Sequence, residues 1–141
     1  MTAALRPYLT FPGTTREAMT FYGEALGAVP QLATFADFGA VAADSPHADK
    51  IMHAALDVDE MIRLYATDHI EGMAPGPFAQ STSMTLALMG EDADEQRLTR
   101  AFEALSAGGR IKMPLRRQVW GADYGSFTDR FGVGWQVNIG G

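Results

Sequence analysis

The most distinctive titratable side chain of the sequence is a histidine within an apolar stretch. His53 lies in "KIMHAALDV", whose length and apolar content predict a strand. An imidazole titrates near neutral pH, so His53 could serve as a base or a hydrogen-bond donor to a ligand. The alternative is a structural hydrogen bond, because buried polar groups are nearly always paired. Both interpretations remain open, and His53 is a candidate ligand-binding residue.

A carboxylate follows the next predicted strand. Asp68 ends "LYATD", where the chain is expected to leave the sheet. A turn-forming aspartate that bonds its own backbone is the plain interpretation, and a pocket carboxylate near His53 is the functional one. His47 and His69 fall in expected loops and are predicted to be solvated. The three histidines therefore do not compose a site of two histidines and one carboxylate.

Aromatic residues gather near the end of the sequence, in "VWGADYGSFTDRFGVGWQVN". Trp120 precedes an irregular "GADYG" stretch, where an indole can reach the mouth of a pocket, and Tyr124 belongs to the same class. Core packing is the alternative for both residues. Strand alternation places Trp135 and Gln136 on opposite faces, so Trp135 is expected to pack under a helix and Gln136 to point toward a ligand. Asp129 is expected in a tight turn between the last two strands.

Composition excludes several classes of function. The 141 residues contain no cysteine, which removes disulfides, thiolate nucleophiles and cysteine-ligated metal sites. The formal net charge of −6 disfavours a nucleic-acid partner and would attract cationic ligands. No apolar run approaches the roughly 20 residues that cross a bilayer, and no secretory signal is evident. We therefore expect a cytoplasmic protein without a nucleic-acid or membrane partner.

The order of predicted elements repeats once along the chain. "RPYLTF" predicts a strand, and a helix follows with a capping box at Thr14 and Glu17 and an end at Gly27. Three strand-like runs come next: "VPQLATF", "KIMHAALDV" and "MIRLYAT". Residues 69–80 read as a Gly/Pro-rich linker. The first βαβββ module is thus assigned to residues 1–68.

The second half repeats this order over residues 81–141. "STSMTLALM" predicts its strand, and a helix capped by Asp92 and Glu95 runs to Gly108. Three further strands are expected in "RIKMPL", in "RRQVWG" running into "YGSFTD", and in "GVGWQVNI". One helix cannot cover a sheet alone, so we predict an α+β domain in which the modules form one cupped mixed sheet with the helices outside. A cupped sheet encloses a cavity.

These segments resemble the vicinal oxygen chelate superfamily of glyoxalase and bleomycin-resistance proteins, and within it the PhnB-like branch. The stretches that carry the resemblance are "PYLTFPGTTREAMTFYGEALGA", "IMHAALDV" with "LYATD", "ALSAGGRIKMPL" and "WGADYGSFTDRFGVGWQVN". The resemblance implies the glyoxalase/bleomycin-resistance fold, a homodimer, and a pocket inside each cupped sheet.

The superfamily's chemistry uses a divalent metal held by His, Glu or Gln from the first and last strands of each module. Matching the motifs places these positions at Pro7, Leu64, Ser83 and Gln136, of which only Gln136 offers a plausible ligand. We therefore predict no metal ligands and no cofactor, and a divalent metal is disfavoured. A dinucleotide or adenosyl cofactor is not expected either, since no glycine loop opens a helix.

The functional expectation is accordingly a PhnB-like protein that binds a small, partly aromatic molecule, as bleomycin-resistance members do. The alternative is a lyase, isomerase or dioxygenase with a displaced metal site or with His53 as acid–base, so whether the chain is an enzyme stays open. A structural homodimer with a vestigial pocket is a third reading. The candidate ligand-binding residues are His53, Asp68, Trp120, Tyr124 and Gln136.

Overall fold

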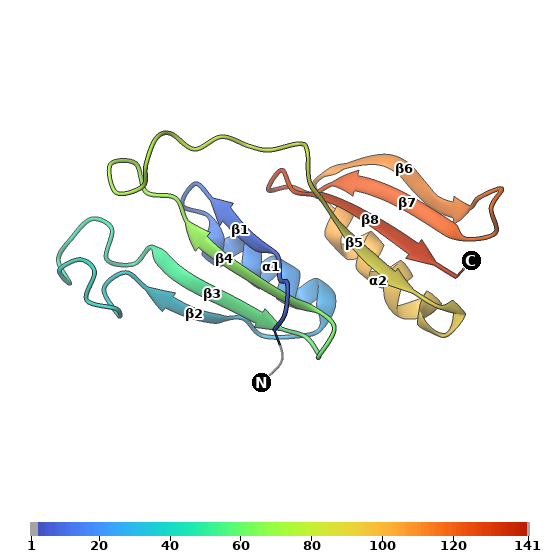
Figure 1. The fold of residues 1–141 in the computed structure, drawn as a ribbon, viewed down its shortest axis with the longest axis horizontal. Coiled ribbons are helices and arrows are strands. Elements are labelled where there is room, and N and C mark those ends of the chain that lie inside the picture. Colours follow the sequence, from blue (N-terminus) through green and yellow to red (C-terminus); the bar gives the residue numbers. More distant parts are fainter. Residues whose placement is uncertain (1–2, 141) are drawn as a thin grey trace. The chain divides into compact units, whose positions relative to one another are not determined.

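The structure is a computed structural model that describes residues 3–140 (Figure 1). The chain divides into two compact units, Met1–Ala79 and Gln80–Gly141, which are described separately. Within the described residues, no helix is long and apolar enough to span a bilayer.

The first unit is a four-stranded sheet with one helix. Its elements are β1 (Tyr8–Phe11), α1 (Thr15–Leu26), β2 (Gln31–Thr34), β3 (Ile51–Asp57) and β4 (Arg63–Asp68). The sheet has the order β1-β4-β3-β2, with β1 parallel to β4 and the other pairs antiparallel. This is the predicted strand–helix–three-strand module.

The second unit repeats the same topology. Its elements are β5 (Thr85–Gly90), the short 3-10 helix η1 (Asp92–Asp94), α2 (Glu95–Ser106), β6 (Arg110–Arg117), β7 (Asp123–Thr128) and β8 (Gly134–Ile139). The order β5-β8-β7-β6 matches that of the first sheet, again with one parallel pair, β5 and β8. The predicted α+β fold class, built from two βαβββ modules, is confirmed, with the described strands forming two four-stranded mixed sheets in place of the single sheet expected.

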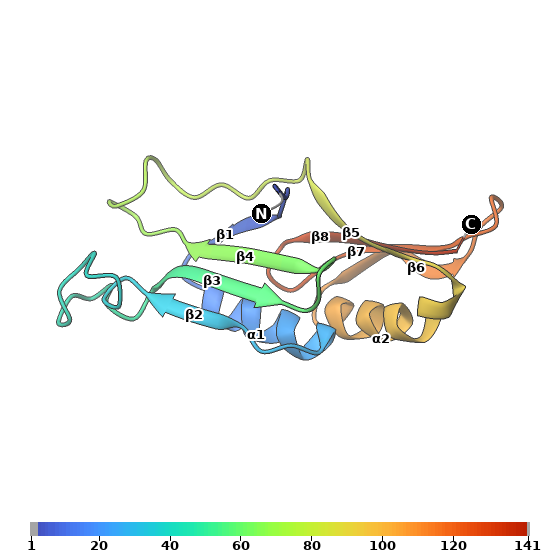
Figure 2. The same ribbon diagram turned by 60° about the horizontal axis from the view of Figure 1, so that its bottom comes forward.

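Each helix covers one face of its own sheet, as both ribbon views show (Figures 1 and 2). Strand residues alternate accordingly between a buried face under the helix and a face without a helix, called here the open face. In β8 the buried residues are Trp135, Val137 and Ile139, and the half-buried ones are Gly134, Gln136 and Asn138. Trp135 is 2% exposed and stacks on Phe127, so its predicted packing role is confirmed.

The predicted helix caps are corrected by the structure. Thr14 makes no side-chain cap bond; instead the Asp68 carboxylate accepts a hydrogen bond from the Thr15 amide at 2.9 Å. The capping box of the second helix region lies one residue earlier than expected, at Glu91 and Asp94, because η1 precedes α2 there. In both cases a carboxylate takes backbone N–H groups that a helix start leaves unpaired.

Asp129 forms the expected tight turn between β7 and β8. Its Oδ1 accepts hydrogen bonds from the amides of Phe131 at 2.8 Å and Val133 at 3.0 Å. Its Oδ2 accepts the indole N–H of Trp135 at 2.9 Å. One buried carboxylate thus ties the turn to the core of its unit.

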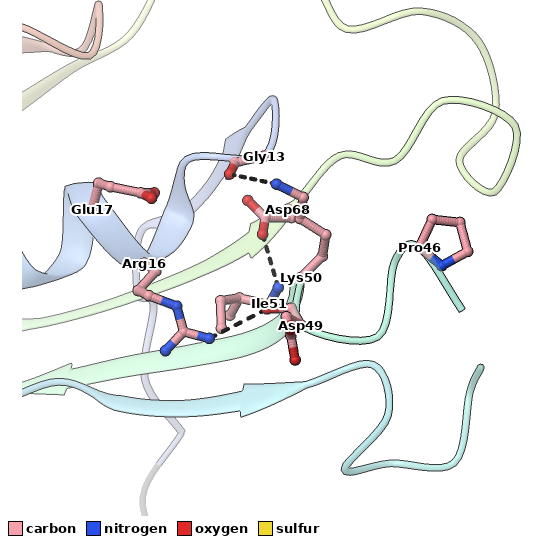
Figure 3. A pocket seen from close by; sticks show the side chains of 8 residues that line it. All are labelled: Gly13, Arg16, Glu17, Pro46, Asp49, Lys50, Ile51 and Asp68. Carbon is pink, nitrogen blue, oxygen red and sulfur yellow. Dashed lines mark hydrogen bonds between the residues drawn. The ribbon is translucent and has the colours of Figure 1, made fainter. Parts of the chain in front are cut away.

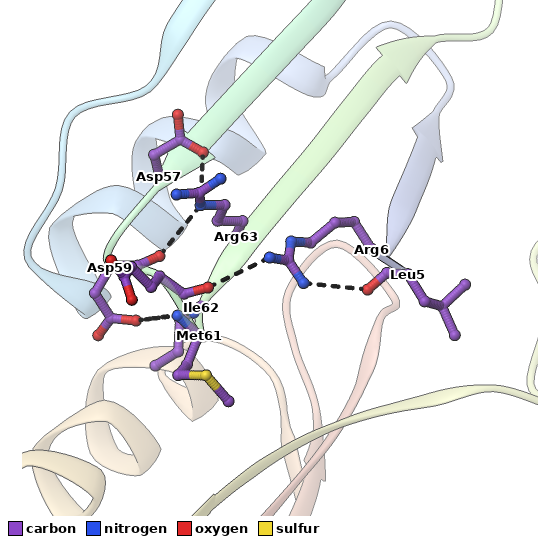
Figure 4. A network of polar contacts seen from close by, with 8 residues as sticks. Leu5, Arg6, Asp57, Asp59, Met61, Ile62 and Arg63 are labelled. Carbon is purple, nitrogen blue, oxygen red and sulfur yellow. Dashed lines mark hydrogen bonds and ion pairs between the residues drawn. The ribbon is translucent and has the colours of Figure 1, made fainter. Parts of the chain in front are cut away.

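The connection between β3 and β4 is held by polar contacts (Figure 4). Asp59 accepts hydrogen bonds from the amides of Met61 and Ile62 at 2.8 and 2.9 Å. Arg63 lies 3.8 Å from Asp57, its cross-strand partner. These contacts support the register of β3 on β4, and a slip of one residue would move every side chain of a strand to the other face.

We predict that Asp68→Ala destabilises the protein by about 2–4 kcal/mol, because the amides of Thr15 and Ile51 would lose their buried acceptor. Urea unfolding followed by circular dichroism measures the change. Asp37→Ala is the control, since Asp37 makes a comparable bond to a backbone amide at an exposed site. Equal losses in the two variants would contradict the role of Asp68.

Candidate functional site

The open face of the first sheet carries a cluster of three rings from three strands. Tyr8 on β1 and His53 on β3 are joined by a hydrogen bond of 2.9 Å between the phenol oxygen and Nδ1. Tyr65 on β4 stacks on the imidazole, with ring centroids 5.7 Å apart, and on Tyr8 at 6.2 Å. His53 is therefore hydrogen-bonded and also lies on the half-buried open face, so both of its sequence interpretations find support.

The phenol of Tyr8 stays neutral at ordinary pH. Partial burial disfavours the phenolate and raises the pKa of Tyr8 above its usual value of 10.0. A neutral phenol can donate a hydrogen bond to Nδ1 or accept one from an Nδ1–H group, according to the imidazole tautomer. The hydrogen bond holds the imidazole in place on this face.

Asp68 lies on the opposite face of the sheet from His53. Its side chain is 5% exposed and faces α1, where Oδ2 also accepts the amide of Ile51 at 2.8 Å. Two residues on opposite faces of a sheet cannot form one site, so the carboxylate is not brought to the histidine. The structure instead shows Asp68 joining α1, β3 and β4.

Asp68 does line a pocket of about 170 Å³ at the start of α1 (Figure 3). The two basic side chains that line it donate hydrogen bonds to backbone carbonyls. Lys50 donates to the carbonyl of Gly13 at 3.3 Å, and Arg16 donates to the carbonyl of Asp49 at 3.2 Å. These bonds hold the loop before β3 against the start of the helix. The pocket is therefore lined by groups that already have structural partners.

The open face of the second sheet brings together the other three candidate residues. Tyr124 on β7 donates a hydrogen bond of 2.8 Å from its phenol to Oε1 of Gln136 on β8. The indole of Trp120 lies against Tyr124 edge to face, with centroids 6.1 Å apart, and 59% of Trp120 is exposed. This group, called here the Trp120 cluster, offers an aromatic surface beside an amide.

The register of the two sheets identifies equivalent positions. Gln136 pairs with Ser126 on β7 and with Ala87 on β5, as Tyr65 pairs with Ala55 on β3 and with Tyr8 on β1. Tyr65 and Gln136 are also each the third residue of a six-residue strand with the same alternation of buried and half-buried residues, so the two positions are equivalent.

The other three positions that the sequence resemblance assigned to metal ligands lie off these open-face positions. Leu64 is 5% exposed and lies on the helix face, one residue before Tyr65. Pro7 precedes β1, and Ser83 precedes β5 and bonds Ser81 at 3.0 Å.

The first and last strands of the two units are β1 with β4 and β5 with β8. Their paired residues on the open faces are Tyr8 with Tyr65 and Ala87 with Gln136. Two phenols, a methyl group and an amide do not fit a divalent ion that is held by imidazole and carboxylate ligands. Among residues 3–140, no group of three or more His, Cys, Asp or Glu side chains is placed to hold a metal ion.

His69 differs from its sequence expectation. Its side chain is 10% exposed, with Nε2 3.8 Å from the Glu71 carboxylate, and its ring meets the edge of Phe78 at 5.9 Å. The prediction of a solvated loop histidine was wrong, because the segment after β4 folds back and covers the ring.

Sequence reasoning missed two members of the first cluster, Tyr8 and Tyr65. The alternation of Tyr8 with Leu9 and Phe11 was a signal for its face. Its contact with His53 was not readable, since the pairing of β1 with β4 and of β4 with β3 brings them together.

Comparisons with known proteins agree with this architecture. Residues 6–137 match the family model described as "Glyoxalase/Bleomycin resistance protein/Dioxygenase superfamily". The chain is 28% identical to protein YjdN of Escherichia coli, over 96% of this chain and 94% of that protein.

Solved structures with the same fold include two bacterial proteins. Protein PA1353 from Pseudomonas aeruginosa has a TM-score of 0.81 and 34% identity, covering 99% of this chain and 98% of that one. A PhnB protein from Bacillus cereus, described as a putative 3-demethylubiquinone-9 3-methyltransferase, has a TM-score of 0.72 and 21% identity, covering 97% and 99%. With a family match over nearly the whole chain, this protein belongs to the glyoxalase/bleomycin resistance/dioxygenase superfamily.

Proposed function

We propose that this chain binds a small, partly aromatic molecule at the Trp120 cluster, without the divalent metal typical of its superfamily. The observation that carries the proposal is the contact of Trp120, Tyr124 and Gln136 on the open face of the second sheet, opposite the face that α2 covers. An exposed indole beside a tyrosine and an amide supplies apolar area together with orienting polar groups.

The exposure of Trp120 favours binding over a purely structural role. Its neighbour Val119 is fully exposed, so the segment places apolar area outside the core. Trp135, in contrast, is buried and its indole N–H is paired with Asp129. The indole N–H of Trp120 has no partner among the described residues, which leaves it available to a ligand.

The absence of a metal requirement rests on the donors at the facing positions of β1 with β4 and of β5 with β8. Tyr8, Tyr65, Ala87 and Gln136 include one neutral amide and no imidazole or carboxylate. Neutral oxygen donors alone give a weak site for transition metals.

In a screen of small aromatic molecules, we expect ligands to shift the indole N–H signal of Trp120 in nuclear magnetic resonance spectra, equally after chelator treatment and after metal supplementation. Trp120→Ala should abolish binding, while Val119→Ala, its exposed neighbour, should leave binding within about twofold. Binding that requires a metal, or close to one metal ion per chain lost in Gln136→Ala, would contradict the proposal.

A second candidate function is metal-free acid–base catalysis of a lyase or isomerase type on the first sheet. The Tyr8–His53 hydrogen bond favours it, because an imidazole can act as a general acid or base and the phenol orients it. We expect Tyr8→Phe to lower any such activity by about a hundredfold. Tyr65→Phe is the matched control, since it keeps the stacking on His53. Equal activity in the two variants would remove this candidate.

The proposal includes a homodimer, as the family resemblance implies, and residence in the cytoplasm, as the composition of the chain favours. Sedimentation equilibrium of the untagged protein should give twice the 15.2 kDa mass of the chain. A mass of one chain at micromolar concentration would contradict the dimer.

A further inference from the structure

We propose that the Trp120 cluster selects ligands that carry an anionic group, such as a carboxylate on a planar ring, and that Arg116 is its charge partner. This inference rests on the proposed binding function and names the chemical class of the ligand. Four observations carry it: the register of β6, the distribution of charge between the two faces, the direction of one hydrogen bond, and the exposure of an indole.

The register of β6 places Arg116 beside the cluster. Arg116 is directly opposite Tyr124 in the antiparallel pair of β6 and β7. Residues directly opposite in such a pair share a face, with their Cβ atoms roughly 5 Å apart. Arg116 therefore lies on the same open face as Tyr124 and Gln136. Its side chain is exposed, and its guanidinium has no partner among the described residues.

Strand alternation separates the charges of this sheet between its two faces. The neighbouring Arg117 is opposite Asp123 and pairs with it at 2.8 Å, on the helix face. The hydrogen bond and charge of Asp123 raise the pKa of Arg117, and the charges of Asp92 and Glu95 add to this effect. The acids near the end of β6 thus gather around Arg117.

The open face of the second sheet carries cations and no acid among its strand residues. Arg110 is opposite Thr128, and Met113 is opposite Ser126. The remaining positions of this face on β5, β7 and β8 are neutral. Arg116 is consequently not neutralised by a neighbour on its own face.

The hydrogen bond between Tyr124 and Gln136 makes the site rich in donors. The phenol donates to Oε1, which uses the acceptor of the amide and leaves Nε2 with two N–H groups. The guanidinium group of Arg116 adds up to five N–H donors and has no hydrogen-bond acceptor. A ligand with acceptor oxygens and a negative charge meets both groups, whereas a cation would be repelled.

The overall acidity of the chain does not oppose this selectivity. Residues 80–141 hold seven basic and seven acidic side chains, so the whole excess of −6 lies in residues 1–79. The sequence expectation of cationic ligands relied on the net charge of the entire chain. For the second unit, local charge favours an anion.

Trp120 supplies the surface for the rest of such a ligand. Its indole meets Tyr124 edge to face, so its own face is not stacked on the tyrosine ring. A planar ring can lie on an indole face of this kind while its carboxylate reaches the polar groups. An aromatic carboxylate therefore matches the cluster better than an aliphatic one.

The test compares three probes of nearly equal size, namely benzoate, neutral benzamide and cationic benzylammonium. Titrations follow the Trp120 indole N–H, which is assigned by its loss in Trp120→Phe. We expect benzoate to bind about tenfold more tightly than benzamide and benzylammonium to bind weakest, with the benzoate affinity falling as salt is added.

Two variants with the same change of charge separate local contact from the general field. Arg116→Gln should weaken benzoate about tenfold and leave benzamide unchanged. Arg117→Gln, one residue away on the opposite face, should change neither affinity by more than about twofold. Circular dichroism confirms that both variants are folded.

The outcomes separate this inference from the function on which it rests. Equal binding of benzoate and benzamide, unaffected by Arg116→Gln, would overturn the anion selectivity and leave ligand binding at Trp120 standing. A preference for benzylammonium would do the same. If all three probes left the Trp120 signal unmoved at millimolar concentration, both the selectivity and the proposed aromatic site would be lost.

Discussion

The constraint on which the chemistry of this protein depends is that each four-stranded sheet has a single helix, which covers one face. A strand turns alternate side chains to opposite faces, so apolar and chemically active residues are sorted residue by residue. On β8, Trp135 and Val137 enter the core while Gln136 remains on the open face between them. On β4 the same rule buries Leu64 and presents Tyr65. The candidate residues that lie in strands, His53, Asp68, Tyr124 and Gln136, obtain their faces from this sorting.

The two buried carboxylates illustrate how burial decides the role of a polar group. Asp68 and Asp129 are 5% and 4% exposed, and both bind two backbone amides. Carboxylates that are fully occupied by such donors have little capacity left for a ligand. In Asp68 this occupation links α1 to β3 and β4, and in Asp129 it anchors a turn to Trp135. The Gln136 amide nitrogen, which has no hydrogen-bond partner among the described residues, lies instead on the open face of the second sheet.

The two open faces differ in chemistry although their topology is the same. The first holds a phenol–imidazole pair, Tyr8 and His53, and the second holds an indole, a phenol and an amide. A fold of this superfamily supports many functions because the activity depends on the side chains at a few such positions. Here those positions carry phenols, an imidazole, an amide and an indole, on which the proposed functions rest. The two faces also differ in the charge of their units, because residues 80–141 have no net charge and residues 1–79 hold the excess of acidic residues.

The helices, the strands and the repeated βαβββ order were predictable from sequence, because hydrophobic periodicity and turn residues are local signals. Gly27 adopts the left-handed conformation expected at the end of α1, and Trp135 packs where alternation placed it. Alternation also predicted the face of Gln136. These features depend only on neighbours along the chain.

The contacts between site residues that are distant in sequence are formed only in the tertiary structure. The contact of Tyr8 with His53 connects residues 45 positions apart in sequence. Arg116 lies opposite Tyr124 in a strand pair whose register is shifted by irregularities in β6. The Thr15 amide donates its hydrogen bond to Asp68, which is 53 residues away, and the local capping box that the sequence predicted does not form. Burial of His69 likewise followed from the path of the chain after β4. Long-range pairing has no local signal in a single sequence, which is why periodicity could place these residues on faces but could not assemble them into sites.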